Sequence, residues 1–584
     1  MKIWKRYLVF GIFTTLVTSI VTFYLYRHVK LKYGYKSRII DRLDEILSFN
    51  SNPSAIFYNL YERSPLYEEL RRLDRKEISS DVARNFLMKP EVVRNLQTHA
   101  INVGLSDLLP LNRPVTDSRP PGCSKIKYPT DLQTVGIVIP FHNEWPSVLL
   151  RTIFSIINKT PKHLLKEIVL VDDCSNLPSL QAHFQGLLEE YFPKDLVKLK
   201  RLKSRSGLIV ARMEGLKFVT ADCVSFFDSH MEVNENWLPP LLAEIKKNPK
   251  TVSMAQLDYI NKETFAYEFE PGYKTRYGFD WRLVFFETYF RADTLNGKSA
   301  TDPLPGVVMV GPGAVVNVQY FKDLGGFDTG MTIWGGENLE FPWRVWMCGG
   351  QMIHVPCSKI GHIARSQPYH FPNGRQDTEN HNYKRAIEVW MDDYKQYVYE
   401  ANPFMKSVDE GDLTERFELK KRLQCKPFKW FLDNVWPELS AYKENNQAWG
   451  WVKNSATNSD ICLDNDDFLF SIPNPVKAKP CSEIVVYQMF SLTSENLFRS
   501  ILQCVVVKGT FLSDKIPTLE GCFEGPAETW THSGPGLLKH DSSNLCLELT
   551  KTRQLVMNLC DEKSPWQKWT FTHYSPAHNK RITA

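Results

Sequence analysis

An Asp-Ser-His triplet at residues 228–230 has the residue types and spacing to do chemistry at a metal ion. Asp228 and His230 follow an apolar run and are two residues apart, so in extended backbone their side chains point to the same side. A carboxylate oxygen and an imidazole nitrogen, with further oxygens from a phosphate ligand, suit Mn²⁺ or a similar divalent cation. By itself the pair is more typical of an ordinary hydrogen-bonded Asp/His contact than of a metal site, so the surrounding sequence must decide.

His362 is the candidate third metal ligand, although this histidine taken alone is more typical of a structural residue. It lies in the segment Cys357–Arg365, where a cysteine could fix the loop that carries the histidine. A divalent ion bound to a diphosphate would neutralise the negative charge that develops on a nucleotide leaving group, and the cation Arg365 would assist. These residue types therefore indicate group transfer from a nucleotide sugar.

The segment Trp334–Asn338 is the candidate for sugar recognition. It combines an aromatic face, two glycines that permit close backbone approach, and the carboxylate of Glu337. The alternative interpretation is a tight turn before a helix, which we expect over Asn338–Cys348. The two interpretations are compatible, because a turn before a helix can also contact a sugar.

Three apolar runs must position these polar residues. The predicted strands are Val135–Pro140, Ile168–Val171 and Cys223–Phe227, and a predicted helix, Ser147–Asn158, lies between the first two. Continuous apolar strands alternating with helices predict an α/β domain with a parallel sheet covered on both faces. Ligands of such sheets bind beyond the carboxyl ends of the strands, where Asp173 and Asp228 lie.

The N-terminus predicts a membrane anchor. Residues 7–26 contain no charged side chain, and a helix of this length spans the roughly 30 Å hydrocarbon layer. A cleaved signal peptide is the alternative, but the apolar stretch is long and no small-residue cleavage site follows promptly. We predict a cytoplasmic tail over 1–6, an uncleaved signal anchor over 7–26 and, over 27–112, a charged stem without an apolar core pattern.

Composition and cysteine spacing predict two folded, lumenal domains. The 584 residues are 43% hydrophobic, and the net charge of +5, without zinc-finger spacing or an arginine-rich arm, gives nucleic-acid binding no support. Beyond residue 445, three segments each carry a cysteine pair and short β-like runs, which indicates a threefold repeat in an oxidising compartment. The spacing pairs Cys462 with Cys481, Cys504 with Cys522, and Cys546 with Cys560.

Asn158 begins an Asn-x-Thr sequon in the predicted helix. Such a sequon is a glycosylation site only if it is exposed, and a chance match fits equally well.

From about Arg113 to the C-terminus, the sequence resembles the polypeptide N-acetylgalactosaminyltransferases. Motifs of that family occur here in the family's order: Phe141–Glu144, Val171–Asp173, Phe227–His230, Ile333–Glu340, Gly361–His362 and Val389–Asp392. The resemblance implies a glycosyltransferase-A (Rossmann-like) catalytic domain over 113–445 and an all-β, ricin-type β-trefoil lectin domain over 446–584. It also implies a single-pass type II Golgi membrane protein.

The activity implied by the resemblance is transfer of N-acetylgalactosamine from UDP-N-acetylgalactosamine to Ser or Thr of protein or glycopeptide acceptors. The cofactor would be Mn²⁺, and the configuration at the anomeric carbon would be retained. In the family the reaction proceeds on one face of the sugar, and the leaving phosphate helps to deprotonate the acceptor hydroxyl, so no enzymic nucleophile is expected.

Residue roles follow from the resemblance by motif. The implied manganese ligands are Asp228, His230 and His362; the implied donor contacts are Asp173, Arg205 and Ser229; the implied mobile-loop residues are Trp334, Arg365 and Tyr369; and Glu337 would lie near the sugar. Of these, Asp228, His230, Trp334, Glu337 and Arg365 would have catalytic roles. The family's disulfide pattern would also pair Cys123 with Cys357 and Cys348 with Cys425, and leave Cys174 and Cys223 free.

The sequence departs from the family pattern in both domains. Val310–Ala314, with Pro312 at its centre, replaces the usual Ala-Gly-Gly-Leu-Phe, and proline lacks a backbone N–H. In the trefoil, Gln-x-Trp remains only at Gln567–Trp569 and Cys-Leu-Asp only at Cys462–Asp464, while Tyr487–Met489 stands where Cys-His-Gly is typical. The alternative function is therefore a catalytically weak or inactive relative that binds Golgi glycoproteins or other transferases.

Overall fold

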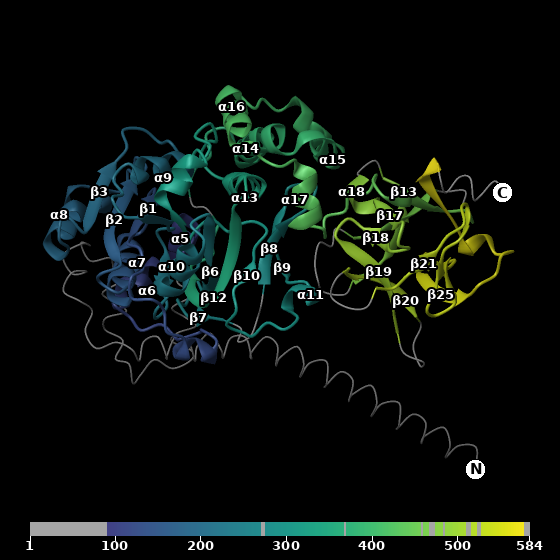
Figure 1. The fold of residues 1–584 in the computed structure, drawn as a ribbon, viewed down its shortest axis with the longest axis horizontal. Helices are drawn as coiled ribbons and strands as arrows, with labels where there is room; N and C mark the ends of the chain where they lie inside the picture. Colours follow the sequence, from purple (N-terminus) through teal and green to yellow (C-terminus); the bar gives the residue numbers. More distant parts are fainter. Residues whose placement is uncertain are drawn as a thin grey trace, which may run out of the picture.

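A computed structural model of the chain describes residues 90–269, 275–366, 369–456, 460–466, 474–482, 485–509, 515–522 and 527–576. The predicted tail, the predicted anchor and most of the predicted stem lie outside these ranges. Within them, no helix combines the length and apolar character needed to cross a bilayer. Two folded units are visible (Figure 1): an α/β domain and, beside it, an all-β domain.

A mixed sheet forms the centre of the α/β domain. In the described chain it has ten strands, in the order β10-β12-β6-β11-β4-β1-β2-β3, with β5 paired to β12 and β7 paired to β6. Their bounds are β1 Val135–Phe141, β2 Leu165–Asp172, β3 Val197–Arg201, β4 Cys223–Phe226, β5 Met231–Val233, β6 Thr251–Ile260, β7 Tyr267–Glu268, β10 Leu304–Pro305, β11 Ala314–Asn317 and β12 Gln351–His362. The predicted parallel pairing holds for β1 to β4, but β11 runs antiparallel to β4 and β6.

Helices cover both faces of this sheet, which explains the continuous apolar runs of β1 and of Ile168–Val171 in β2. Val138 and Val171 pack in one hydrophobic cluster with α9 (Leu208–Leu216). Their strand neighbours Ile137 and Leu170 pack in another with α7 (Pro146–Lys159) and α10 (Leu238–Lys247). Because neighbouring strand residues alternate between faces, both faces need apolar side chains.

The remaining helices surround the sheet and complete the α/β domain. They are α5 Pro90–His99, α6 Val103–Leu108, α8 Ala182–Tyr191, α11 Ala292–Leu295, α12 Val318–Asp323, α13 Glu337–Met347, α14 Arg375–Trp390, α15 Lys395–Ala401, α16 Thr414–Leu423 and α17 Phe428–Asn434, with a hairpin of β8 Thr275–Phe279 and β9 Phe285–Tyr289. The predicted helix Asn338–Cys348 is thus confirmed as α13. It begins after Gly336, whose φ of 92° favours glycine.

Residues 101–109, which the sequence assigns to the stem, pack against the α/β domain. Every residue of α6 is buried, and Val103 and Leu105 contact a cluster that includes Phe265 and Ile363. Asn102 caps α6, because its Oδ1 accepts from Leu105 N at 3.2 Å, and its Nδ2 donates to Glu263 O at 3.0 Å. The folded unit therefore begins before residue 113.

Replacing this cap tests whether α6 belongs to the cooperative fold. Asn102→Ala should lower the free energy of unfolding by about 1–2 kcal/mol, because the variant loses a helix cap and a buried hydrogen bond. Thermal or denaturant unfolding measures it, and the exposed Asn296, changed to Ala, is the control. Equal stability of Asn102→Ala and the parental protein would place α6 outside the cooperative unit.

The C-terminal domain is the predicted β-trefoil. Its described strands are β13 Asn446–Asn454, β14 Ile461–Asp464, β15 Asn474–Pro475, β16 Lys477–Pro480, β17 Phe490–Thr493, β18 Phe498–Ser500, β19 Gln503–Lys508, β20 Ile516–Gly521, β21 Trp530–Thr531, β22 Gly536–Leu537, β23 Lys539–His540, β24 Leu545–Leu549, β25 Leu555–Leu559 and β26 Lys568–Tyr574. Trp530 and Trp569 are fully buried in its core.

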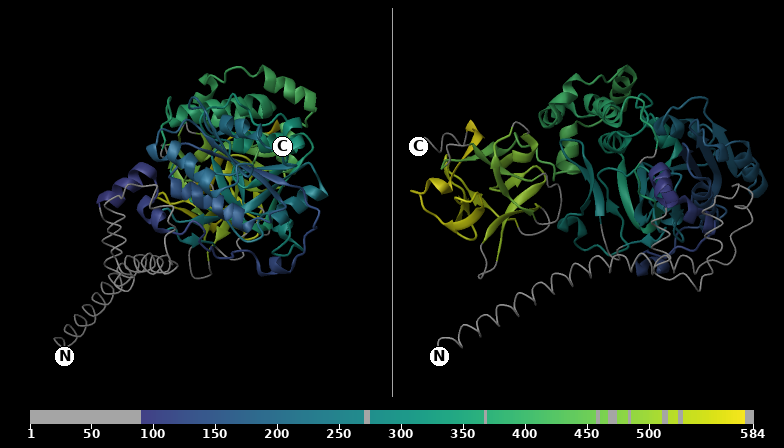
Figure 2. Two further views of the ribbon diagram at one scale, coloured as in Figure 1. Left: turned by 90° about the vertical axis from the view of Figure 1, so that its left-hand side faces the viewer. Right: turned by 180° about the vertical axis from the view of Figure 1, so that it is seen from behind.

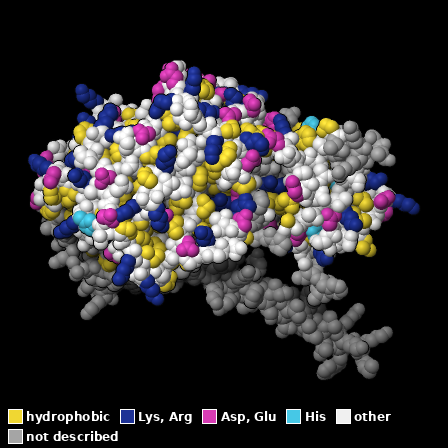
Figure 3. All heavy atoms as spheres, in the orientation of Figure 1, with side chains coloured by type: hydrophobic (Ala, Val, Ile, Leu, Met, Phe, Trp, Pro, Cys, Tyr) yellow, Lys and Arg dark blue, Asp and Glu magenta, His cyan; other side chains and the backbone are white. Residues whose placement is uncertain are grey.

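On the face of the whole molecule shown in Figure 3, acidic and basic side chains are interspersed, as the small net charge suggests.

All five predicted disulfides are present, and Cys174 and Cys223 are free. Two of them join distant parts of the α/β domain, with a sequence separation of 234 between Cys123 and Cys357 and of 77 between Cys348 and Cys425.

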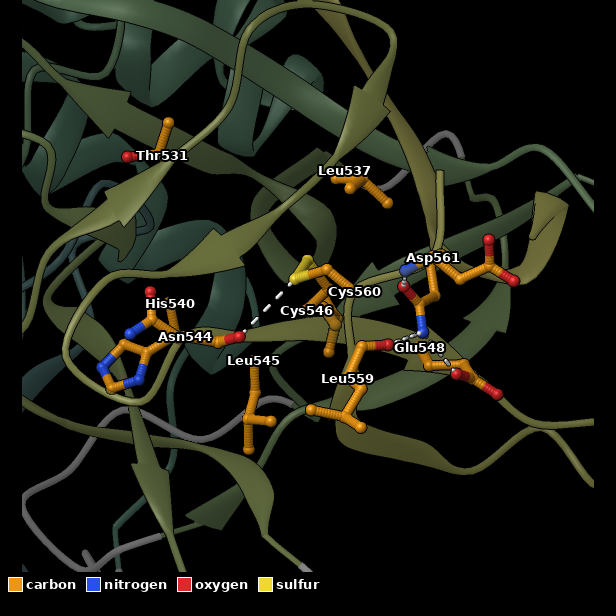
Figure 4. The surroundings of a disulfide bond; sticks show 12 residues. Thr531, Leu537, His540, Asn544, Leu545, Cys546, Glu548, Leu559, Cys560 and Asp561 are labelled. Carbon is orange, nitrogen blue, oxygen red and sulfur yellow. Dashed lines mark hydrogen bonds between the residues drawn. A yellow bond between two sulfur atoms is a disulfide. The ribbon is translucent and has the colours of Figure 1, made fainter. Parts of the chain in front are cut away.

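The other three disulfides each close one trefoil repeat. They join Cys462 to Cys481, Cys504 to Cys522, and Cys546 to Cys560, with sequence separations of 19, 18 and 14. Figure 4 shows the third of them, between β24 and the end of β25. The pairing that the cysteine spacing predicts, Cys481 and Cys522 included, is therefore confirmed.

The contacts of Gln488 correct the interpretation of the first trefoil repeat. Gln488 Nε2 donates to Asp464 Oδ2 at 3.0 Å, as Gln567 Nε2 donates to Glu548 Oε2 at 2.7 Å. Each glutamine also accepts one backbone N–H, from Ser482 and from Asp561. Tyr487–Met489 therefore does not replace a Cys-His-Gly motif; Gln488 occupies the Gln-x-Trp position.

The shared contacts imply that these glutamines hold the repeats together. Gln567→Ala should lower the free energy of unfolding of the trefoil by about 1–2 kcal/mol, because a buried side chain loses its hydrogen bonds with Glu548, Leu559 and Asp561. Denaturant unfolding measures the change, and the exposed Gln554, changed to Ala, is the control. A Gln567→Ala protein as stable as the parental one would show that the glutamine carries no structural role.

The trefoil contacts the α/β domain directly. Helix α18 (Val485–Gln488) lies beside α15 (Figures 1 and 2). Ser440 N donates to Ile501 O at 3.1 Å, Arg499 donates to the Glu438 carbonyl, and the Arg282 guanidinium lies 5.5 Å from the Tyr487 ring centroid. Polar and aromatic contacts thus join the two domains.

Candidate active site

The three predicted metal ligands converge at the edge of the sheet where the parallel strands end. Asp228 follows β4, His230 precedes β5, and His362 ends β12, which pairs with β5. Their ligand atoms lie within 4.8 Å of one another. His362 Nε2 is buried without a hydrogen-bond partner in the described structure, 3.3 Å from Asp228 Oδ2. One carboxylate and two imidazoles with an unpartnered ring nitrogen fit a divalent cation.

Glu144 connects this triad to Arg365. Its Oε2 accepts hydrogen bonds from Ser229 Oγ, His230 Nδ1 and Arg365 Nη2. Burial raises the pKa of the Glu144 carboxyl, but the Arg365 charge and these hydrogen bonds outweigh it and bring the pKa to about 2. Burial and the Arg365 charge lower the pKa of His230, which favours the neutral imidazole that a metal requires. In this arrangement the Ser229 hydroxyl faces Glu144.

Arg212 joins Asp228 to Glu337. Its side chain is 1% exposed, with Nη1 3.0 Å from Glu337 Oε1 and Nη2 3.5 Å from Asp228 Oδ1. Burial raises the pKa of Asp228, but the neighbouring His362 ring, together with the Arg212 charge, lowers it below its usual range. Glu337 Oε2 is buried without a hydrogen-bond partner among the described residues. A buried acceptor of this kind is suited to a ligand hydroxyl.

Asp173 fixes the loop that carries Arg205. Its two oxygens accept from Ser206 N and Gly207 N, each at 2.7 Å, and it pairs with Arg205. The Arg205 guanidinium lies 5.0 Å from the Tyr369 ring centroid. The predicted donor contacts Asp173 and Arg205 therefore lie beside Tyr369.

The Trp334 loop packs closely on the Arg205 loop. Gly207 has a φ of 94°, and a Cβ there would lie 2.4 Å from Ile333 Cα, so only glycine permits this approach. Asn382 on α14 donates to the Trp334 carbonyl at 3.0 Å, and the Arg375 guanidinium lies 5.2 Å from the Trp334 ring centroid. Backbone and side-chain contacts together place Trp334 at the site.

These side chains line one cavity of about 590 Å³, which includes the triad, Glu337, Trp334 and Pro312. The glycines on either side of Pro312, Gly311 and Gly313, have φ values of 110° and 77°. The departure from the family pattern therefore lies in the cavity wall.

The predicted glycosylation site lies outside this cavity, at the end of α7. Asn158 is exposed, while Thr160 of its sequon is buried and accepts from Trp237 Nε1. Its glycosylation stays a prediction.

Two residues of the site were missed as functional residues by sequence reasoning. Glu144 follows β1 at the same sheet edge as Asp173, so the strand-end argument could have found it. Arg212 lies in α9, whose sequence Leu208–Leu216 is mostly apolar, and a charged residue on the buried face of such a helix indicates a buried partner.

Comparison with known proteins identifies the family to which this chain belongs. Residues 136–306 match Glycosyl transferase family 2, residues 303–370 match the N-terminal domain of galactosyltransferase, and residues 448–569 match the Ricin-type beta-trefoil lectin domain. The chain is 38% identical over 520 residues to polypeptide N-acetylgalactosaminyltransferase 11 of Xenopus tropicalis, covering 84% of this chain and 85% of that one. The chain belongs to the polypeptide N-acetylgalactosaminyltransferase family.

Other members of this family give the same result. The human polypeptide N-acetylgalactosaminyltransferase 14 is 36% identical over 485 residues, covering 81% of this chain and 85% of that one. A crystal structure of GalNAc-T7 with UDP, GalNAc and Mn²⁺ has a TM-score of 0.57 and 29% identity, covering 83% of this chain and 91% of that one. As a family member, this chain has a glycosyltransferase-A domain followed by a ricin-type trefoil.

Proposed function

We propose that this protein transfers N-acetylgalactosamine from UDP-N-acetylgalactosamine to Ser or Thr hydroxyl groups of polypeptide or glycopeptide acceptors, starting mucin-type O-glycans. The transfer would require Mn²⁺ and retain the anomeric configuration. The observation that carries the proposal is the triad Asp228, His230 and His362, which opens onto the same cavity as Glu337 and Trp334.

The charges of the cavity fit a diphosphate donor. Asp228, His230 and His362 would hold the cation, which supplies positive charge to stabilise a UDP leaving group. Arg205 and Arg365, both in the cavity wall, add positive charge for the phosphates. Asp173 orders the loop that presents Arg205, since it accepts two backbone N–H groups of that loop.

The sugar end of the donor would lie at Glu337 and the Gly311–Gly313 turn. Glu337 Oε2 would accept a hydrogen bond from a sugar hydroxyl, while Arg212 holds Oε1. We assign no side chain as a nucleophile, because in a same-face transfer the leaving phosphate helps to deprotonate the acceptor hydroxyl. Pro312 offers no backbone N–H to the donor.

A catalytically silent relative that binds glycoproteins or other transferases is the second candidate. Pro312 in the cavity wall favours it, because a donor-sugar contact made by a backbone N–H at this position would be lost. Such a protein would still bind UDP and metal at the described site. Product formation therefore separates the two candidates.

The experiment is an assay with the purified full-length protein, UDP-N-acetylgalactosamine, Mn²⁺ and a panel of Ser/Thr peptides and glycopeptides. Mass spectrometry should find a product that has gained one N-acetylhexosamine, and chelation of the metal should abolish it. Measurable UDP binding without product from any acceptor would rule out the proposal and favour the silent relative.

We further propose that the protein is a single-pass type II Golgi membrane protein with both domains in the lumen. The uncharged run at residues 7–26 and the five disulfides support this placement. An epitope at the C-terminus should resist protease in intact Golgi vesicles and be digested after detergent is added. Digestion without detergent would contradict the topology.

A further inference from the structure

Glu144 contacts the metal triad and the Arg365 loop with a single oxygen atom. The residue is 2% exposed and lies between β1 and α7. Its Oε2 is 2.7 Å from Ser229 Oγ, 2.8 Å from His230 Nδ1 and 2.5 Å from Arg365 Nη2. The other oxygen, Oε1, accepts from Trp145 N at 2.9 Å. Both oxygens are thus engaged within the site.

The contact with His230 determines which ring nitrogen can bind a cation. Nδ1 faces the Glu144 carboxylate, so it carries the proton and donates, and Nε2 keeps its lone pair. A carboxylate on the far nitrogen of a metal-binding histidine fixes the orientation of the ring and makes it a more basic ligand. The His230 and His362 ring centroids lie 5.1 Å apart, so the orientation of the His230 ring decides which of its nitrogens faces a cation shared with His362.

Arg365 is supported from a second side by the segment that precedes α6. Its Nη1 donates to the carbonyl of His99, the last residue of α5, at 2.6 Å. The His99 ring lies 4.8 Å from the Trp145 ring, and Trp145 Nε1 donates to Asp107 at 2.8 Å. The N-terminal segment and the Glu144 loop thus hold the guanidinium between them.

We propose that Glu144 is a positioning residue of this site. It holds His230 with Nε2 available to the cation and keeps Arg365 beside the triad, with the His99 carbonyl as the second support. The inference rests on the proposed metal site. It differs from a purely structural role, because it requires that loss of the carboxylate weakens metal binding even when the fold is intact.

The test is the affinity of Mn²⁺ for the full-length protein and for Glu144→Gln, measured by titration calorimetry or electron paramagnetic resonance. The amide has the same size but no charge, so the variant should bind Mn²⁺ about 10- to 100-fold more weakly. The control is Glu167→Gln, which should leave the affinity unchanged. Glu167 is a buried carboxylate paired with Lys198 near the start of β2, at the end of the strand away from the site. Thermal unfolding verifies that each variant is folded.

Equal Mn²⁺ affinity of Glu144→Gln and the parental protein would overturn this inference and leave the proposed function standing. A parental protein that binds no Mn²⁺ would instead overturn the proposed metal site, and the inference with it. A second measurement uses the parental protein, so it does not depend on whether a Glu144 variant folds. It is ¹⁵N NMR of the histidines in the metal-free protein, which reports the tautomer of each ring. His230, assigned by the signal lost in His230→Asn, should be the Nδ1–H tautomer, and an Nε2–H tautomer would overturn the inference.

Discussion

Asp228→Asn should lower kcat/KM for sugar transfer by at least about 10³-fold. Asp228 is the carboxylate of the triad, and an amide is a weaker ligand for a hard divalent cation. Charge stabilisation by a bound cation is worth several kcal/mol, and each 1.36 kcal/mol corresponds to a tenfold change in rate. Initial rates of transfer to a peptide acceptor, at a series of Mn²⁺ concentrations, measure the loss.

Asp222→Asn is the matched control for this prediction. Asp222 directly precedes β4, whereas Asp228 follows the same strand, and Asp222 hydrogen bonds with Thr134 away from the cavity. The control should retain parental activity and Mn²⁺ affinity. Full activity in Asp228→Asn would remove the metal site from the account.

Glu337→Gln should lower kcat/KM by about 10- to 100-fold and leave UDP affinity unchanged. A hydrogen bond to a charged group is worth about 1.5–3 kcal/mol, and the Glu337 oxygen without a partner is placed to make one with the donor sugar. Because glutamine has nearly the same shape, the cavity should keep its form. Initial rates and a UDP titration measure the two effects separately.

The control for Glu337 is Glu244→Gln, on α10, whose carboxylate pairs with Lys247 and does not line the cavity. It should behave as the parental protein. If Glu337→Gln lost UDP affinity as strongly as it lost activity, Glu337 would belong to the nucleotide end of the site and not to the sugar end.

The strand ends of the site were predictable from local sequence. The runs that became β1, β2 and β4 are apolar except for Ser225, because both faces of each strand are covered. Each run stops where the backbone reaches the open edge of the sheet. Asp173 and Asp228 lie just beyond the ends of β2 and β4. The ligand role of His362 needed the family motifs, because β12 enters the sheet more than 120 residues after β4.

Features that depend on distant partners could not be predicted from the sequence. Arg212 acquires its role only when α9 brings it to Glu337, 125 residues away. Gln488 could be placed in the Gln-x-Trp position only by its contact with Asp464, since the motif lacks its tryptophan. The reversed direction of β11 likewise depends on the chain returning across the sheet.

The most direct test of the central claim is the structure of the product. The full-length protein, incubated with UDP-N-acetylgalactosamine, Mn²⁺ and a Ser/Thr acceptor, should give a glycopeptide whose proton NMR spectrum shows N-acetylgalactosamine α-linked to a Ser or Thr oxygen, the configuration of the donor. A β-linked product would contradict the account, and so would attachment of the sugar to an atom other than a Ser or Thr oxygen. The absence of any glycopeptide while UDP binds would contradict it as well.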